Sequence, residues 1–387
     1  MPGFELIGEE EFQRVKSVFD KGGILFRHSF DHLRNGTYMV RDFEESFAQR
    51  MQSPRALAVT SGTAALRVAL AALNIKEGDE VITQSFTFVA TVEAIIESRA
   101  KPVCCEIDST LNMDPMDLAE KITPQTKAII VVHMLGTPAR LEEITAIAKK
   151  NRIPVIEDTA WGCGGRLKDR SLGTWGDIGT FSFDFAKTMT TGEGGMLVFK
   201  DTNIADRAAA WHDHGHENNP EYPRWEDTRS SSGFNYRMME LQGAVGLAQL
   251  EKLDSVVLSQ RKNAQAIRCA LEELPIEFRE SPVGSYETAD ALIFFVPNRE
   301  IARNCREELL SAGLGTKILP EAYTWHFAAT WGHMKELVNA HEDILEKSFP
   351  RSTELLNRAV SLPITVQMND DVPHRTRNAV EKALIQL

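Results

Sequence analysis

Short apolar runs alternate with amphipathic stretches from about Ala56 to Asp158. The apolar runs are rich in β-formers and bounded by Gly, Pro or Asp, which is typical of strands. Strands are therefore predicted at residues 56–60, 80–84, 102–107, 127–134 and 154–158, and helices at residues 62–73, 88–98 and 141–150. This alternation predicts a mostly parallel sheet with helices on both faces. Ligands of such a sheet bind at the carboxyl ends of its strands.

The second half of the chain has a different pattern. A Leu- and Ala-rich helical region at residues 238–274 is expected to link the large domain to a smaller one. One clear strand pattern follows at residues 291–298, among several helical patterns, as in a small α/β domain. We therefore predict an α/β protein with a large domain at residues 1–255 and a smaller C-terminal domain at residues 256–387.

Composition narrows the class of protein. The formal net charge of −12 over 387 residues disfavours nucleic acids and acidic membranes as partners. The 5 cysteines are odd in number and form no CxxC pair, so reduced thiols in the cytoplasm are expected rather than a disulfide framework or a zinc ribbon. The N-terminus lacks the pattern of a signal peptide, and no apolar run reaches the length of a membrane span, so neither feature is expected.

Two polar motifs stand at the ends of predicted strands. SGTAAL, residues 61–66, opens a helix after a strand, and its free amides and hydroxyls suit an anion. An ordinary helix cap by the serine explains the same residues. Asp158 ends the strand VIED, where a carboxylate can cap a helix, hold a metal or pair with a ring nitrogen.

Lys187 lies between two further predicted strands, residues 179–183 and 195–201, which places it on a loop at the sheet edge. A buried lysine has a lowered pKa and becomes a nucleophile. The GEGG segment after it lets the backbone turn tightly and approach a bound ring. A surface lysine on a turn is the alternative interpretation.

Together the three motifs match the requirements of pyridoxal 5′-phosphate (PLP). The helix start would hold the phosphate, Asp158 would keep the pyridine nitrogen protonated, and Lys187 would form a Schiff base with the aldehyde. A GxGxxG fingerprint is absent from the first strand turn, which disfavours a dinucleotide-binding dehydrogenase. The sequence thus predicts a PLP enzyme.

At these residues the sequence resembles the DegT/DnrJ/StrS family of sugar aminotransferases, which have PLP fold type I. FSFDFAKTMTTGEGG is similar to the lysine motif of that family. Other family motifs are matched in order, over essentially the whole chain, by SGTAAL, SFTFVAT, VVHMLG, VIED and GFNYRMMELQGAVGLAQLEKLD. The resemblance implies a large domain with a mostly parallel sheet flanked by helices, plus a smaller C-terminal α/β domain. Some members carry histidine at the lysine position and act as dehydratases, so Lys187 favours the aminotransferase branch.

The resemblance also implies a role for each matched residue. Lys187 is implied as the Schiff-base lysine and the general acid–base, and Asp158 as the partner of the pyridinium. Phe88 is implied to stack on the cofactor ring, with a core aromatic as the alternative. Asn235 is implied to reach the phosphate of a neighbouring subunit in a homodimer, with a plain turn residue as the alternative. The other implied phosphate ligands are Gly62, Thr63 and Ser182.

Trp161 departs from the family pattern. The family usually has glutamine three residues after the pyridinium aspartate, where it contacts the phenolic oxygen of the cofactor. Tryptophan offers one indole N–H donor and no acceptor. We therefore expect this oxygen to be held differently or the ring to be tilted. A PLP-binding regulatory protein without turnover is the alternative of another class, and Trp161 is the residue that hints at it.

Three segments, residues 22–44, 211–219 and 323–334, together with the opening MPGFEL, resemble the branch that makes 8-amino-3,8-dideoxy-manno-octulosonate. This implies amino transfer from glutamate to an 8-keto octulosonate in cell-surface polysaccharide or lipopolysaccharide biosynthesis. Amination of a nucleotide-linked keto-hexose is the alternative. A free acid sugar requires cationic or N–H donors. Candidates are Arg27, His28, His32, Arg34, His214, His216 and His326.

The alternating histidines of HDHGH, residues 212–216, raise the question of a metal site, because histidines at period two can share one face of a strand. The polar, aperiodic surroundings favour a substrate loop or a plain surface loop. No metal is therefore expected.

Overall fold

A seven-stranded sheet forms the centre of the computed structural model, which describes residues 2–219, 221–341 and 344–385. The strand order is β1-β9-β8-β5-β4-β2-β3. The strands are β1 (Arg55–Val59), β2 (Glu80–Gln84), β3 (Lys101–Cys105), β4 (Thr126–Val132), β5 (Val155–Asp158), β8 (Ile178–Ser182) and β9 (Gly195–Phe199). All neighbours pair in parallel except β9, which is antiparallel to β1 and β8. The predicted fold class, with a mostly parallel sheet, is confirmed.

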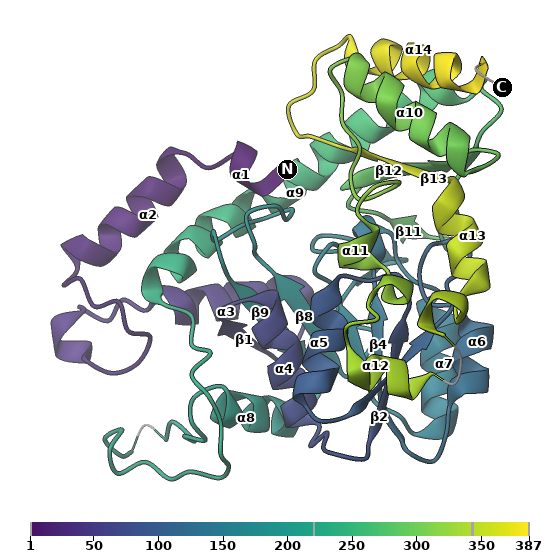
Figure 1. Cartoon of the computed structure of the whole chain (residues 1–387). Helices are drawn as coiled ribbons and strands as arrows, with labels where there is room; N and C mark the ends of the chain where they lie inside the picture. Colours follow the sequence, from purple (N-terminus) through teal and green to yellow (C-terminus); the bar gives the residue numbers. More distant parts are fainter. Residues whose placement is uncertain (1, 220, 342–343, 386–387) are drawn as a thin grey trace.

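Helices cover both faces of this sheet (Figure 1). One face carries α4 (Gly62–Ala72), α5 (Val89–Glu97) and α8 (Thr202–Trp211). The other carries α3 (Met39–Met51), α6 (Pro115–Lys121), α7 (Leu141–Asn151) and the 32-residue α9 (Glu240–Leu271). Along β1, Leu57 and Val59 pack with the first set, while Ala56 and Ala58 pack with the second. The strands read as continuous apolar runs because both of their faces are buried.

The loop that carries Lys187 joins β8 to β9, as expected, but the expectation that it lies at the sheet edge is wrong. β9 has β1 as its outer neighbour, and β8 has β5 on its other side. β1, the first strand in the sequence, pairs with β9, the last strand of this sheet in the sequence. Pairing between such distant segments leaves no mark in the local apolar pattern, so the sequence could not place the edge.

The C-terminal part forms a smaller α/β unit. Its antiparallel sheet has the order β10-β12-β13. The elements are β10 (Glu277–Phe278), β12 (Ala291–Phe295), β13 (Ala359–Pro363), α10 (Arg299–Ser311), α13 (Pro350–Arg358) and α14 (Val372–Ile385). The sequence predicted only β12, because β10 is two residues long and β13 ends in proline. The division at residue 255 stays a prediction, and that residue lies inside α9.

Short elements connect these parts. A third small sheet has the order β11-β6-β7, with β6 (Arg166–Leu167), β7 (Arg170–Ser171) and β11 (Ser285–Tyr286). The connection from α10 to α13 holds α11 (Tyr323–His326) and α12 (Lys335–Ala340), with 3-10 turns at Ala328–Thr330 and Leu345–Lys347. Two further 3-10 turns are Asp31–Leu33 and Met134–Gly136.

Two segments lie outside the layered core. The N-terminal helices α1 (Pro2–Glu5) and α2 (Glu9–Asp20) run alongside α9, and the segment between α8 and α9 projects from the same side of the molecule (Figure 1, purple and lower-left teal). Glu11 anchors α2, since its buried carboxylate accepts hydrogen bonds of 2.8 Å from Lys252 and Gln249 on α9. Among the described residues, no helix is both long and apolar enough to span a bilayer.

Candidate active site

A cavity of about 330 Å³ opens at the carboxyl ends of the parallel strands. Turns after β1, β2, β5 and β8 supply most of its lining. Of the predicted cofactor residues, it brings together Gly62, Thr63, Phe88, Asp158, Trp161, Ser182 and Lys187. These residues are far apart in the sequence but adjacent here, because the parallel strands end on the same side of the sheet.

A larger cavity of about 500 Å³ lies at the other end of the sheet. Ser53 and Pro54, which precede β1, and Asp177, which precedes β8, contribute to its lining. It therefore opens at the amino ends of the parallel strands. Open α/β sheets bind ligands at the carboxyl ends, and the smaller cavity is the one lined by Lys187 and the buried carboxylate of Asp158.

The start of α4 forms one wall of the active-site cavity. Ser61 caps the helix, with its Oγ accepting a hydrogen bond from the Ala64 amide at 3.0 Å. The capping interpretation is therefore correct, and it leaves room for an anion, because the amides of Gly62 and Thr63 have no partner inside the helix. A Cβ at Gly62 would lie 2.7 Å from Ser182 Cβ, so glycine is needed for β8 and α4 to approach this closely.

Asp158 forms the floor of the cavity at the last position of β5 and is 6% exposed. Its Oδ2 accepts a hydrogen bond from Thr91 Oγ1 at 2.9 Å, and its Oδ1 accepts one from the Ala160 amide at 3.2 Å. Burial raises the pKa of this carboxyl, and the two hydrogen bonds oppose that shift. Sequence reasoning missed Thr91, whose only signal is a polar residue one helical turn after Phe88.

Lys187 approaches from the β8–β9 loop. Its Nζ lies 3.3 Å from the centroid of the Trp161 ring, and it makes no hydrogen bond within the part of the chain that the structure describes. Burial lowers the pKa of this lysine to about 8. About a tenth of the Lys187 side chains are therefore free amines at pH 7, far more than for an ordinary lysine. The alternative of a surface lysine on a turn is excluded.

Aromatic rings form the mouth of the cavity. The Phe88 ring stacks on Trp325 at a centroid distance of 6.1 Å, and His326 lies at 5.5 Å from Phe88. His326 is buried, and its Nδ1 lies 3.1 Å from the Ala322 carbonyl, which requires the proton on this nitrogen. Burial lowers the pKa of His326 to about 4, so it is neutral at physiological pH. His326 is the one substrate candidate that lines the cavity.

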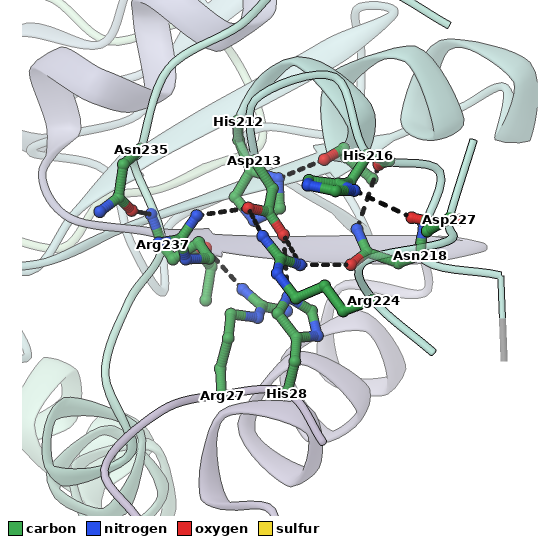
Figure 2. A network of polar contacts seen from close by, with 12 residues as sticks. Arg27, His28, His212, Asp213, His216, Asn218, Arg224, Asp227, Asn235 and Arg237 are labelled. Atoms are coloured by element: carbon green, nitrogen blue, oxygen red, sulfur yellow. Dashed lines mark hydrogen bonds and ion pairs between the residues drawn. The ribbon is translucent and has the colours of Figure 1, made fainter. Parts of the chain in front are cut away.

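The other substrate candidates lie elsewhere in the chain. Arg27 binds both oxygens of Glu44 at 2.8 Å, and His28 lies 3.4 Å from Asp213 (Figure 2). Arg34 is buried and donates to the carbonyl of Phe26. His32 and His214 are exposed, and His216 pairs with Asp227 at 3.2 Å. None of these lines the cavity of its own chain as the structure describes it.

Figure 2 shows His28, Arg224 and Arg237 converging on Asp213 between the N-terminal segment and the projecting segment. The fully buried Asp213 pairs with Arg224 and Arg237 as well as with His28. Charge partners hold the pKa of Asp213 far below its usual range. Asp213 was not predicted from the sequence, because its partners are distributed over two segments.

Asn235 also lies on the projecting segment. It is exposed, its Oδ1 accepts a hydrogen bond from the Arg237 amide at 3.3 Å, and its backbone bridges to Asp213. It does not line the cavity of its own chain. Its predicted role at the site of a neighbouring subunit therefore stays a prediction.

The histidines of residues 212–216 do not gather around one point. His212 is buried and bonded to the carbonyl of Ala209, His214 is exposed, and His216 pairs with Asp227. Within the described ranges, no cluster of three or more His, Cys, Asp or Glu side chains could hold a metal ion.

The cavity fits PLP on three observations. Its volume lies within the roughly 300–1,000 Å³ of small-molecule sites. The tight approach at Gly62 leaves helix amides facing the space where a phosphate would lie. The buried carboxylate of Asp158 can pair with a protonated ring nitrogen. The Nζ of Lys187 makes no hydrogen bond to the described residues, so it can join the aldehyde.

Comparison with known proteins agrees with this geometry. Residues 7–381 match the model of the DegT/DnrJ/EryC1/StrS aminotransferase family. The chain is 40% identical to a GDP-perosamine synthase of Escherichia coli O157:H7 over 247 residues, which are 64% of this chain and 66% of that protein. It is 30% identical to a GDP-perosamine synthase of Vibrio cholerae over 89% of this chain and 90% of that one.

Among solved structures, 3-amino-5-hydroxybenzoic acid synthase superposes with a TM-score of 0.86 at 26% identity, covering 100% of this chain and 99% of that one. The family model spans the whole layered core and the smaller C-terminal unit. The chain belongs to the DegT/DnrJ/EryC1/StrS aminotransferase family, and it is a PLP-dependent sugar aminotransferase.

Proposed function

We propose that this enzyme moves an amino group from glutamate to a keto-sugar at the cavity around Lys187. The observation that carries the proposal is a half-buried lysine whose Nζ makes no hydrogen bond to the described residues, in one cavity with a buried aspartate and an open helix start. When bound, PLP supplies an aldehyde that accepts an amino group and a ring that withdraws electrons from the substrate carbon.

Each residue then has a defined task. Lys187 Nζ would hold the aldehyde of the cofactor and, once free, would carry the proton at the reacting carbon. A pKa of about 8 leaves this nitrogen able both to take and to give a proton near neutrality. Asp158 keeps the ring nitrogen protonated, and the Thr91 hydroxyl holds Asp158 in place.

The remaining cavity residues bind and shield. The amides of Gly62 and Thr63 with the Ser182 hydroxyl hold the phosphate. Phe88 and Trp161 form apolar walls beside the ring and keep water from the reacting atoms. Asn235 reaches the phosphate of the partner site in a homodimer, which is compatible with its exposure and its absence from the cavity of its own chain.

The keto-sugar we propose is an 8-keto octulosonate, in the biosynthesis of a cell-surface polysaccharide or lipopolysaccharide. Support comes from the resemblance of residues 22–44, 211–219 and 323–334 to the octulosonate branch. A carboxylate on this sugar calls for cationic groups, and the projecting segment carries two arginines, Arg224 and Arg237, which both pair with Asp213. The free cysteines support our proposal that the reaction takes place in the cytoplasm.

A nucleotide-linked keto-hexose is the second candidate. Its support is the similarity to two proteins named GDP-perosamine synthase. The two candidates differ in where the anionic charge sits, on a sugar carboxylate or on a diphosphate. Both would use the same chemistry at Lys187.

The first experiment is an absorption spectrum of the purified protein with PLP, before and after glutamate. We expect a visible band that moves to the near-ultraviolet with glutamate, and its loss in Lys187→Ala together with a fall in turnover of more than about a thousandfold. A band that ignores glutamate would rule out this donor. Measurable transamination by Lys187→Ala would rule out the mechanism.

The second experiment supplies each candidate sugar with glutamate and measures 2-oxoglutarate. Release of 2-oxoglutarate with the octulosonate, and a kcat/KM at least about a hundredfold lower with the nucleotide-linked keto-hexose, is the expected result. The reverse preference would assign the enzyme to nucleotide-linked sugars.

A further inference from the structure

The side-chain nitrogens of Lys187 and Lys317 both lie close to the indole ring of Trp161. Lys187 Nζ lies 3.3 Å from the centroid of Trp161, and Lys317 Nζ lies 4.8 Å from the same centroid. Trp161 is only 9% exposed, so this contact takes place largely away from water. A ring face attracts each cation, while the two cations repel one another through a medium that screens them poorly.

Lys317 brings a counter-ion with it. Its Nζ lies 2.5 Å from Asp290 Oδ2, and the side chains of Lys317 and Asp290 are 14% and 1% exposed. The second oxygen of Asp290 has no hydrogen-bond partner among the residues that the structure describes. Thr288, two residues before Asp290, donates to the Trp161 carbonyl at 3.1 Å, which fastens this segment to Trp161.

Packing alone does not require the buried ion pair of Lys317 and Asp290. Taking both charges out of water costs free energy, and apolar residues of similar size often stabilise a fold as well or better. The placement of the pair is what distinguishes it. It lies in the C-terminal unit, outside the cavity lining, yet Lys317 approaches the same Trp161 ring as Lys187.

We propose that Asp290 and Lys317 are positioning residues that set the protonation of Lys187 across the ring of Trp161. Asp290 favours the ammonium form of Lys187, and Lys317 favours the free amine. With both charges present, their effects on the protonation of Lys187 oppose each other. The proposal rests on the proposed role of Lys187 as the amine that joins the cofactor and carries the proton.

The direction of each effect follows from the charges around Lys187. Burial dominates and lowers its pKa to about 8; Asp290 is the carboxylate that opposes this most, ahead of Asp158 and Asp184, and Lys317 adds to the lowering. His326 also faces Lys187 and is neutral. Of these charged groups, only Asp290 and Lys317 lie outside the cavity lining, so they can be changed without removing a cofactor contact.

The test measures the pKa of Lys187 directly in the cofactor-free protein. Trinitrobenzenesulfonate reacts only with free amines, and mass spectrometry of the Lys187 peptide gives its labelling rate at each pH. Lys317→Met should raise the pKa by about one unit and slow labelling at pH 7 about tenfold. Asp290→Asn should lower the pKa by about one unit and speed labelling at pH 7 about fivefold.

The double variant, Asp290→Asn with Lys317→Met, removes both charges and should return the pKa to within about half a unit of the starting value. It also covers the case in which Lys317→Met alone fails to fold with an unpaired buried carboxylate. Glu142→Gln and Lys168→Met are the matched controls, because they break an exposed lysine–carboxylate pair and should leave Lys187 unchanged.

Opposite shifts in the two single variants, cancelled in the double variant, would establish the proposal. Equal pKa values in all variants, or shifts of the same sign in both single variants, would overturn it. Because labelling needs neither cofactor nor turnover, this result is independent of whether glutamate and the keto-sugar react. A failed transamination assay and an unchanged Lys187 pKa are therefore separate outcomes.

Discussion

At the scale of single residues, burial acts on the two central groups in opposite directions. It lowers the pKa of Lys187 to about 8 and raises the pKa of Asp158. Both shifts favour the neutral form, because a low-dielectric site disfavours any charge. A neutral amine is what Lys187 needs to act as a nucleophile. Asp158 must instead stay ionised, and the hydrogen bonds from the Thr91 hydroxyl and the Ala160 amide stabilise its charged form.

Thr91→Val should therefore weaken the enzyme without unfolding it. The change removes the 2.9 Å hydrogen bond to Asp158 but keeps the shape of the side chain. A hydrogen bond to a charged group contributes about 1.5–3 kcal/mol, so kcat/KM for the glutamate half-reaction should fall about ten- to a hundredfold. The measurement is the decay of the visible band after mixing with glutamate.

Thr145→Val is the control for that change. Thr145 Oγ1 donates to the Leu141 carbonyl within α7, away from the cavity. Its removal should leave the glutamate half-reaction within about twofold of the parent enzyme. Equal losses in the two variants would mean that Thr91 supports the fold and not Asp158.

At the scale of elements, the site depends on how closely the start of α4 approaches the end of β8. Ser61 ends the extended backbone after β1 and caps the helix, and Gly62 then faces Ser182 with no room for a Cβ. Sheet order makes this possible, since β9 lies between β1 and β8 and its first residue, Gly195, also passes close to Ser61.

Gly62→Ala should loosen cofactor binding. The added Cβ would lie 2.7 Å from Ser182 Cβ and 3.1 Å from its Oγ, so α4 or the serine must move away from the phosphate position. We expect the Kd for PLP to rise at least about tenfold, which corresponds to about 1.4 kcal/mol. Absorption titration of the cofactor-free protein with PLP measures it. Gly315→Ala, where a Cβ meets nothing within 4 Å, should bind PLP like the parent.

At the scale of the whole molecule, the chain exposes large apolar side chains on the two segments outside the layered core. Phe12 and Phe19 of α2 are 59% and 56% exposed, and on the projecting segment Trp225 is 84% and Phe234 56% exposed. Exposed apolar groups gathered on extensions mark interaction surfaces. Together with Asn235 on the projecting segment, they support the proposed homodimer, in which each chain completes the site of its partner.

Hybrid dimers test this arrangement. Lys187→Ala and Asn235→Ala should each be nearly inactive as homodimers. When the two differently tagged variants are coexpressed, a purified hybrid has one site with both residues intact and should recover about half of the parental activity, if each site takes Asn235 from the other chain. No recovery in a confirmed hybrid would contradict a shared site. Light scattering gives the oligomeric state alongside.

Local patterns were sufficient to predict most of the central sheet. The seven strands that build it, the helices α4, α5 and α7, and Lys187 and Asp158 at strand ends were placed from the sequence, because apolar periodicity and strand-end motifs are local properties. The short helix α6 was not predicted. The cofactor followed from motif chemistry and resemblance. The substrate candidates from Arg27 to His216 did not fall into the cavity, because they were chosen by charge alone in loops, where periodicity says nothing of position.

Contacts between segments that are distant in the sequence were decided only by the tertiary structure. The bond from Thr91 to Asp158 spans 67 positions, and the Asp290–Lys317 pair meets Trp161 from another part of the chain. The sequence by itself determined which elements form and which residues stand at their ends, since a strand or helix follows from the burial of its own side chains. The order in which the strands pair, and the packing of the C-terminal unit against them, determine which ends meet. They also determine which neighbours shift the pKa of each charged group. Local sequence patterns show neither the strand order nor this packing.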